Sequence, residues 1–208
     1  MAARGTRRGR PRAGEQADRR RRVITAALDE LIEHGYERVT MLGVASRAGA
    51  SKETLYRWFG SKEGLFAALI EANADQSAER VRQALEGDAD PEEILVGYAV
   101  GLLTLLTGAP SVALNRAAVA SPDLAEVLLV NGRHRVGPLV EAYLARLSDD
   151  GVLEVADPAE AFELLYGLVI RDTQIRVLLG EPGPGPEAIR RRATTAVAEF
   201  LLLAGRRR

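Results

Sequence analysis

The 208-residue chain contains no cysteine and only two histidines. The lack of cysteine excludes a disulfide framework and a thiolate metal site, and it fits a reducing, cytoplasmic environment. His34 and His134 lie a hundred residues apart, and no spacing of His, Asp and Glu is typical of a metal site. We therefore expect neither a metal nor a cofactor.

Long apolar runs and strand patterns are also missing. No run approaches the roughly eighteen uninterrupted apolar residues of a membrane span. The arginine-rich start has no apolar h-region, and the first serine is Ser46, so neither a secretory signal nor a serine-rich transit peptide is expected. No alternation of useful length predicts a strand, and hence no glycine-rich phosphate loop can follow one. The pattern indicates an all-α cytoplasmic protein.

The most informative stretch, from Thr40 to Phe59, contains two short helical patterns separated by Ala48-Gly49-Ala50. The second pattern keeps Leu55 and Phe59 on one inward face. Its outward side chains are Lys52, Glu53, Arg57 and Trp58. A helix in a DNA major groove needs this mixture of cations, hydrogen-bonding groups and an aromatic ring. The stretch predicts a helix-turn-helix; the alternative is a set of short core helices in a larger bundle.

Capping residues mark the ends of these helices. Thr40 and Ser51 stand where N-caps are expected, and Ser61 opens a third helix. Gly49 supplies the left-handed turn conformation, and Gly60 ends the second helix. Three caps and two glycine stops within some twenty residues predict a tightly folded three-helix head.

The net charge of −1 conceals a strong asymmetry. Residues 1–62 contain fourteen Lys and Arg against seven Asp and Glu, a balance of +7. Residues 63–208 contain fourteen against twenty-two, a balance of −8. A basic head on an acidic body is typical of a DNA-binding protein whose remainder avoids DNA.

The run Ile24–Ala74 resembles the DNA-binding head of the tetracycline-repressor (TetR/AcrR) family of bacterial transcription regulators. The matching residues are Ala26-Ala27, Leu31, Gly35-Tyr36, Thr40-Met41, Val44-Ala45, Ala48-Gly49, Ser51-Lys52, Thr54-Leu55-Tyr56, Trp58-Phe59, Ser61-Lys62-Glu63 and Leu65-Phe66. Two positions depart from the family pattern. Leu42 replaces a polar residue, and Gly43 stands where alanine is common, at a cost of about 1 kcal/mol to its helix.

The resemblance implies a set of DNA contacts on the head. Thr40, Tyr56 and Lys62 are expected at phosphates, and Lys52, Thr54 and Arg57 at base edges. Ser51 and Trp58 complete the expected surface, with Trp58 near phosphate or sugar.

An arginine-rich arm, residues 1–18, precedes the head. It has low complexity and no apolar periodicity, so we expect it to be disordered. Gly9-Arg10-Pro11-Arg12 resembles an AT-hook core, which would place Arg10 and Arg12 in a minor groove. The alternative is a solvated tail attracted to any phosphate. The head is then expected at 19–66, and a ligand-binding and dimerisation domain at 67–208.

The rest of the chain reads as helices, giving about nine in all. Gly137-Pro138 is expected to kink one of them. Pro91 occupies the first-turn position that tolerates proline. The helices expected after the head are Ser61 to about Leu85, Pro91–Thr107, Pro110–Ala120, Ser121–Ser148, Pro158–Leu179 and Pro186–Ala204.

The last two helices, near 158–180 and 186–204, are expected to form a homodimer interface, as the resemblance implies. The residues behind this expectation are Phe162, Leu165, Tyr166, Val169, Ile170 and Val177, with Ile189, Ala193, Val197, Phe200 and Leu201. The alternative is that these stripes pack inside one subunit. The middle and end of the chain also resemble AefR-like regulatory domains, through Asn115-Arg116, Ser121-Pro122-Asp123-Leu124, Gly151-Val152-Leu153 and Asp157-Pro158 with Ala161.

A small-molecule effector is expected in the body, in a mainly apolar pocket with a few orienting groups. The candidates are Tyr98, Asn115, Tyr166, Arg171 and Gln174, with Arg116 beside them. Arg133-His134-Arg135 is interpreted as a solvated basic face, with a ligand anchor as the alternative. Arg171-Asp172, which interrupts an apolar helix, favours an ion pair or interface contact over a ligand contact.

These observations predict a dimeric, sequence-specific DNA-binding regulator. We expect a repressor that a hydrophobic small molecule releases from a pseudo-palindromic operator. One alternative is an architectural DNA-binding protein without an effector. A second is a DNA-tethered enzyme, for which no local catalytic cluster is present in the sequence.

Overall fold

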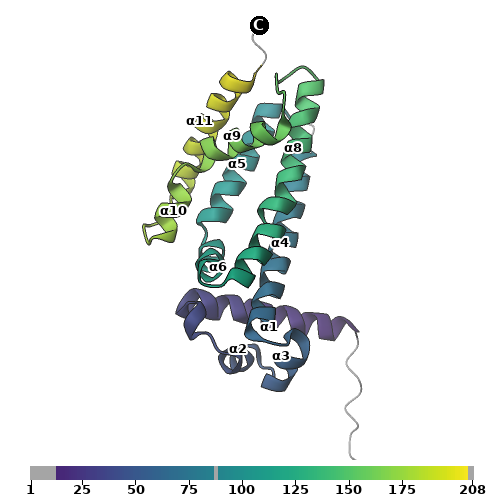
Figure 1. The fold of residues 1–208 in the computed structure, drawn as a ribbon, viewed down its shortest axis with the longest axis vertical. Helices are drawn as coiled ribbons and strands as arrows, with labels where there is room; N and C mark the ends of the chain where they lie inside the picture. The colour runs from purple at the N-terminus through teal and green to yellow at the C-terminus, as the bar shows by residue number, and fades with distance from the viewer. Residues whose placement is uncertain (1–12, 87–88, 206–208) are drawn as a thin grey trace, which may run out of the picture. The chain divides into compact units, whose positions relative to one another are not determined.

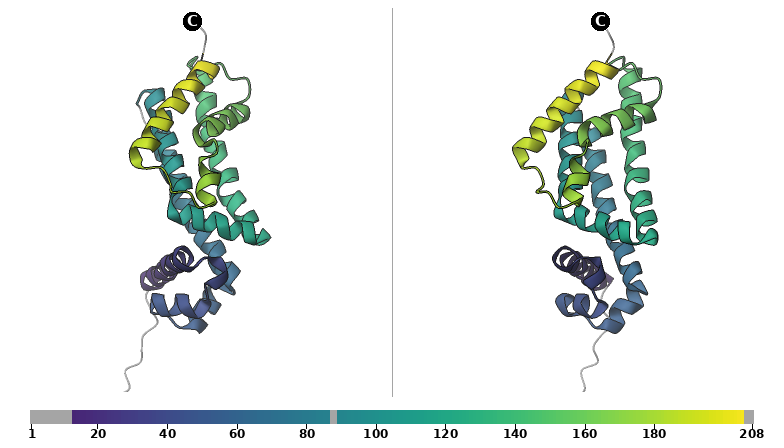
Figure 2. Two further views of the ribbon diagram at one scale, coloured as in Figure 1. Left: turned by 90° about the vertical axis from the view of Figure 1, so that its left-hand side faces the viewer. Right: turned by 60° about the vertical axis from the view of Figure 1, so that its left-hand side comes forward.

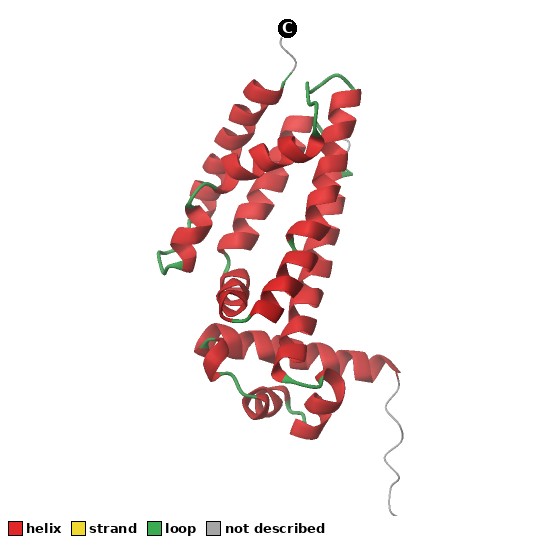
Figure 3. Ribbon diagram, viewed as in Figure 1, coloured by secondary structure: helices red, strands yellow, loops and turns green. Residues whose placement is uncertain are grey.

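In the computed structural model, residues 13–86 and 89–205 are described, and they form helices joined by short connections (Figures 1 and 3). They divide into two compact units, with the division inside α4 between Leu69 and Ile70. The head was expected to end at residue 66, three residues earlier. The predicted all-α class is confirmed: no strand occurs in the described part of the chain, where Leu153 and Gly205 form one isolated bridge.

Unit 1 contains a bundle of short helices packed on a longer one. Its helices are α1 (Ala13–His34), the 3₁₀ turn η1 (Tyr36–Arg38), α2 (Met41–Ala48), α3 (Lys52–Phe59) and the start of α4 (Lys62–Leu85). Its core is apolar and closed; the buried side chains include Val23, Ala27, Leu31, Val44, Leu55, Leu65 and Phe66. Helix α1 begins at Ala13, so 13–18, expected in the arm, are helical.

Unit 2 contains the rest of α4 and seven further helices in the described residues. They are α5 (Pro91–Thr107), α6 (Ala109–Ala120), α7 (Pro122–Asn131), α8 (Arg133–Asp149), α9 (Pro158–Ile170), α10 (Thr173–Leu178) and α11 (Pro186–Ala204). Prolines begin α5, α9 and α11 at the position where a missing N–H costs nothing. Asp90 and Asp157 cap α5 and α9 by accepting from backbone N–H groups.

The core of unit 2 is built where α5, α8, α9 and α11 pack together (Figure 2). Helix α5 is central, because Leu95, Ala99 and Leu103 are at most 1% exposed. Among the described residues no single helix is both long and apolar enough to cross a membrane. Helices α5 and α6 reach that length and composition only as a pair bent by 58°.

The structure has eleven α-helices among the described residues, where about nine were expected. Both additional helices come from breaks. The stretch expected as one helix from Ser121 divides at Gly132, whose backbone is not helical, while Pro138 lies inside α8. The break thus comes five residues before Gly137-Pro138, where a kink was expected, and α8 continues through Pro138. The stretch Pro158–Leu179 divides at Arg171, which adopts φ 46°.

Candidate functional site

The two helices of the predicted helix-turn-helix are held by their caps. The Thr40 hydroxyl accepts from the N–H of Gly43 at 3.1 Å, and the Ser51 hydroxyl accepts from that of Thr54 at 3.3 Å. Between them Gly49 adopts a left-handed conformation, φ 62° and ψ 36°, which a residue with a Cβ enters at a cost. Gly60 ends α3 with φ 75°. The caps and the two glycines thus fix the residues at which α2 and α3 begin and end.

Helix α3 buries Leu55 completely and leaves its polar face open. Lys52, Glu53 and Arg57 are exposed, and Tyr56 is 45% exposed. The Lys52 ammonium lies 5.6 Å from the centroid of the Tyr56 ring. Two cations and a phenol on one exposed helix are groups that can bind phosphates and base edges.

The remaining expected DNA contacts have mixed surroundings. Thr40 and Ser51 are exposed N-cap residues. Thr54 is half-buried, and its hydroxyl oxygen lies 3.0 Å from the hydroxyl oxygen of Ser51. Trp58 is half-buried, and its ring lies edge-on to that of Phe59 with the two ring centroids 6.3 Å apart. It therefore presents only part of the indole outward. Arg10 and Arg12, and with them the minor-groove hypothesis, lie outside the described residues.

Lys62 has a structural partner that the sequence did not indicate. Its ammonium donates to the backbone carbonyl of Tyr36 at 2.5 Å and lies 4.2 Å from the centroid of the Tyr36 ring. The ring in turn packs edge-on against Phe66 at 5.1 Å. Lys62 thus joins α4 to η1, and a phosphate contact would use its other N–H donors.

Arg47 on α2 is neutralised within the head. It donates to Glu33 through Nη1 at 2.7 Å and Nη2 at 2.5 Å, while Nε pairs with Glu30 at 2.7 Å. These hydrogen bonds with Arg47 hold the pKa of the Glu33 carboxyl below its usual range. The same network explains Gly43, since a Cβ there would stand 3.2 Å from the Glu30 carboxylate and 3.3 Å from the Thr40 hydroxyl. Glycine leaves room for both the cap and the ion pair.

In unit 2, polar side chains from three helices lie near one another. Tyr98 on α5 is 3% exposed, and Tyr166 on α9 is half-buried. The guanidinium carbon of Arg133, the first residue of α8, lies 4.4 Å from the Phe162 ring and 5.1 Å from the Tyr166 ring. The interpretation of Arg133-His134-Arg135 as a solvated face is therefore wrong for Arg133. The break at Gly132, which the sequence pattern did not indicate, makes Arg133 the first residue of α8, where its guanidinium meets these rings.

The other expected ligand residues form no hydrogen bond or ion pair with this group among the described residues. Asn115 donates to its own helix at the Ser111 carbonyl, and Arg116 donates to the carbonyls of Val177 and Leu178 at the end of α10. Arg171 is exposed and pairs with Glu199 at 3.2 Å. Gln174 is half-buried on α10. The preference for an ion pair at Arg171-Asp172 holds, but the partners are Glu199 and Arg176 rather than each other.

A surface cleft of about 260 Å³ lies where α5, α10 and α11 adjoin. Its polar lining includes Thr173, Arg176, Glu181 and Arg192. Arg176 and Glu181 form an ion pair, which lowers the pKa of Glu181. None of the five predicted ligand residues lines this cleft.

The apolar stripes expected at the dimer interface lie instead within one subunit. Phe162, Leu165 and Val169 of α9 are at most 2% exposed, and so are Ala193, Val197 and Phe200 of α11. They belong to the core that includes α5 and α8. Other apolar residues of α9, α10 and α11, and the residue that follows α10, are exposed: Leu164, Ile175, Leu179, Leu202 and Leu203. The assignment of these six residues to a dimer contact is therefore wrong, whereas a homodimer through the last helices stays a prediction.

The fold and the α2–turn–α3 geometry define a helix-turn-helix DNA-binding protein. Comparison with known proteins gives the family. Residues 23–69 match the family described as bacterial regulatory proteins, tetR family, and residues 93–203 match the AefR-like transcriptional repressor C-terminal domain. Because the second match alone covers more than half of the chain, the chain belongs to the TetR family of transcriptional regulators, with an AefR-like C-terminal domain.

Individual relatives agree with this assignment. The regulator BetI of Rhizobium meliloti is 27% identical over 168 residues, 78% of this chain and 82% of BetI. The activator FasR of Mycolicibacterium smegmatis is 36% identical over 78 residues, which are 38% of this chain and 36% of FasR. This last match thus spans just over a third of FasR.

Solved structures show the same fold. A TetR regulator from Agrobacterium tumefaciens has a TM-score of 0.73 and 34% identity, covering 89% of this chain and 94% of that one. A TetR-family regulator from Mesorhizobium loti has a TM-score of 0.82 and 24% identity, covering 91% and 98%. The chain is therefore a DNA-binding transcriptional regulator with an N-terminal helix-turn-helix head.

Proposed function

We propose that this regulator is a homodimeric repressor that binds a pseudo-palindromic operator and leaves it when a small, mainly apolar ligand binds unit 2. The observation that carries the DNA-binding part is the exposed face of α3, where Lys52, Tyr56 and Arg57 stand on a helix fixed by the Ser51 cap. Thr40, Tyr56 and Lys62 would contact phosphates. Lys52, Thr54 and Arg57 would contact base edges.

A dimer is supported by the apolar surface of the last three helices. Leu202 is 83% exposed and Leu203 66% exposed on α11, and Leu179, the residue that follows α10, is 80% exposed. Large apolar side chains that reach this exposure favour burial against a second copy. A two-fold dimer would place two α3 helices about one duplex turn apart, roughly 34–36 Å, as successive major grooves require.

Release by a ligand is supported by the polar groups inside unit 2. Tyr98 and Arg133 each bury a donor atom without a partner among the described residues. Solved structures of this fold include one regulator in complex with choline and another in complex with triclosan. A ligand that binds one arrangement of the dimer better would shift the population away from the DNA-binding arrangement. DNA and ligand would then oppose each other reciprocally.

Selection of bound duplexes from a random pool tests this proposal. The full-length protein should enrich one inverted repeat whose half-sites are about one turn apart. An architectural DNA-binding protein would retain the pool without enrichment, and that result would refute the proposal. Sedimentation of the free protein at the same concentration should show a dimer.

A further inference from the structure

Tyr98 and Arg133 each present a buried polar atom that the described protein does not satisfy. The Tyr98 hydroxyl and Nη1 of Arg133 are both inaccessible to solvent and have no hydrogen-bond partner in the described residues. The Arg133 guanidinium lies 4.4 Å from the centroid of the Phe162 ring, and Phe162 belongs with Tyr98 to one buried core cluster. Helices α5, α8 and α9 therefore bring the two side chains into the same part of unit 2.

Among the described residues Arg133 has one acidic partner, and that partner leaves Nη1 without a hydrogen bond. Nη2 lies 3.4 Å from Glu163, whose side chain is 73% exposed. An ion pair this long with an exposed carboxylate contributes little. Leaving a buried N–H of a guanidinium unpaired is costly, because the group loses hydrogen bonds to water and gains none. The buried side of Arg133 can therefore bind an acceptor that the described residues do not supply.

The chemistry of these groups selects the acceptor. Arg133 offers N–H donors and a positive charge. Burial raises the pKa of Tyr98 and Tyr166, so both phenols stay protonated at neutral pH and Tyr98 can donate. A guanidinium with an adjacent phenol O–H matches an oxyanion, and its planar fork matches a carboxylate best.

The surroundings limit the rest of the ligand. The Arg133 guanidinium lies over the Phe162 ring, and Gly137 allows that ring to approach α8, since a Cβ there would be 3.1 Å from it. Tyr98 and Phe162 belong to the apolar core cluster of unit 2. We propose that the effector is an amphipathic molecule with a single carboxylate, bound by Arg133 Nη1 and the Tyr98 hydroxyl, and an uncharged apolar remainder. This inference rests on the proposed function, for which it names the ligand class.

Matched pairs of probes test the carboxylate requirement in the full-length protein by calorimetric titration. The pairs are decanoate with 1-decanol, and 2-naphthoate with 2-naphthamide. In at least one pair the carboxylate should bind roughly 10- to 100-fold more tightly than its neutral partner. Arg133→Met should abolish this preference and leave the affinity for the neutral probe within about 3-fold. Tyr98→Phe should weaken carboxylate binding by a smaller factor.

Arg135→Met is the matched control, because Arg135 lies on the same helix and pairs with the exposed Asp75 at 2.5 Å. It should bind all four probes as the unaltered protein does. Failure of both carboxylates to bind, or an equal loss in Arg133→Met and Arg135→Met, would overturn the inference. Tyr98→Phe keeps the test decisive if Arg133→Met does not fold, since unchanged carboxylate binding would also refute it.

Release of DNA is measured separately, on a duplex selected from the random pool. A carboxylate that binds through Arg133 without releasing DNA supports the ligand class and contradicts the inducer role in the proposed function. A protein that binds its duplex specifically but ignores both carboxylates contradicts this inference alone. The two proposals therefore fail on different readouts.

Discussion

The ammonium of Lys62 donates to the carbonyl of Tyr36 at 2.5 Å, joining the first residue of α4 to η1. If Lys62 also contacts a phosphate, as proposed, Lys62→Met should act on both stability and DNA affinity. We expect a loss of about 1 kcal/mol in the free energy of unfolding, measured by urea denaturation. Affinity should fall similarly for all duplexes, and the salt slope should decrease by about 1.

Arg38→Met is the control for Lys62, because Arg38 also donates to a backbone carbonyl, that of His34 at 2.7 Å. It removes the same charge from the same unit. An unchanged salt slope in Lys62→Met, or an equal change in Arg38→Met, would show that Lys62 is structural only.

Arg57 is exposed on α3 and is proposed to read a base edge. Arg57→Ala should cost about 1–3 kcal/mol of binding to the selected duplex and relax the preference at one base position. Arg47→Ala removes the same charge from α2, where Glu30 and Glu33 already neutralise it. It should leave the base preference intact. A loss for Arg57→Ala that is equal on all sequences would contradict the assignment.

Gly49 joins α2 to α3 with φ 62°, and a Cβ there would meet nothing within 4 Å. Gly49→Ala should therefore lower the free energy of unfolding by about 1 kcal/mol, which is the cost of the left-handed backbone alone. Gly49→Asn should cost less, since asparagine tolerates this conformation better. Gly64 is a contrasting position, because a Cβ there would come closer than 3.0 Å to the carbonyl oxygen of Phe59. Thermal unfolding should therefore show a larger loss of stability for Gly64→Ala than for Gly49→Ala. An equal or smaller loss for Gly64→Ala would contradict this prediction.

Leu202 is 83% exposed on α11, and the proposed dimer buries it. Leu202→Glu should raise the dimer dissociation constant by roughly tenfold or more, as charge burial opposes association. Val119→Glu on α6 is the control, since Val119 is 86% exposed but lies outside the last three helices. Sedimentation should show dissociation for the first variant alone. Equal behaviour of the two would exclude α11 from the interface.

The ends of the head helices could be predicted because their signals are local. Thr40 and Ser51 cap the helices that follow them within three residues, and Gly49 supplies its own conformation. The partner of Lys62 could not be predicted, since Tyr36 is twenty-six residues away and the contact depends on the packing of η1 against α4. Helical periodicity likewise identified the apolar faces of α9 and α11 but not what covers them.

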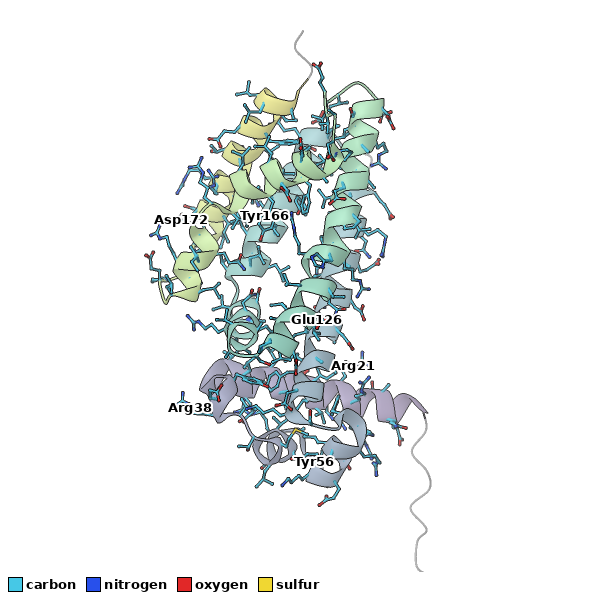
Figure 4. The ribbon with its side chains drawn as sticks, in the orientation of Figure 1. Arg21, Arg38, Tyr56, Glu126, Tyr166 and Asp172 are labelled. Atoms are coloured by element: carbon cyan, nitrogen blue, oxygen red, sulfur yellow. The ribbon has the colours of Figure 1, made fainter. Side chains whose placement is uncertain are left out.

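The inward position of Arg133 illustrates the same limit in unit 2. A basic triplet after Gly132 looks solvated when one continuous helix is assumed. The helix actually ends at Asn131 and restarts at Arg133, which changes the direction of that side chain. The break between α9 and α10, in contrast, coincides with the charged pair Arg171-Asp172, which interrupts the apolar pattern in the sequence. Its two residues pair with Glu199 and Arg176, so they support the junction of α9 and α10, where Asp172 lies at the outer edge (Figure 4).

The central claim is that α3 reads sequence as part of a dimer, and the ratio of specific to non-specific affinity tests it most directly. The selected duplex and a shuffled duplex of equal composition should be titrated with the full-length protein at one salt concentration near 0.15 M. The account predicts a ratio of roughly 10³ or more, lost progressively as either half-site is scrambled. A ratio within about tenfold at this salt would contradict it, because charge alone gives that result.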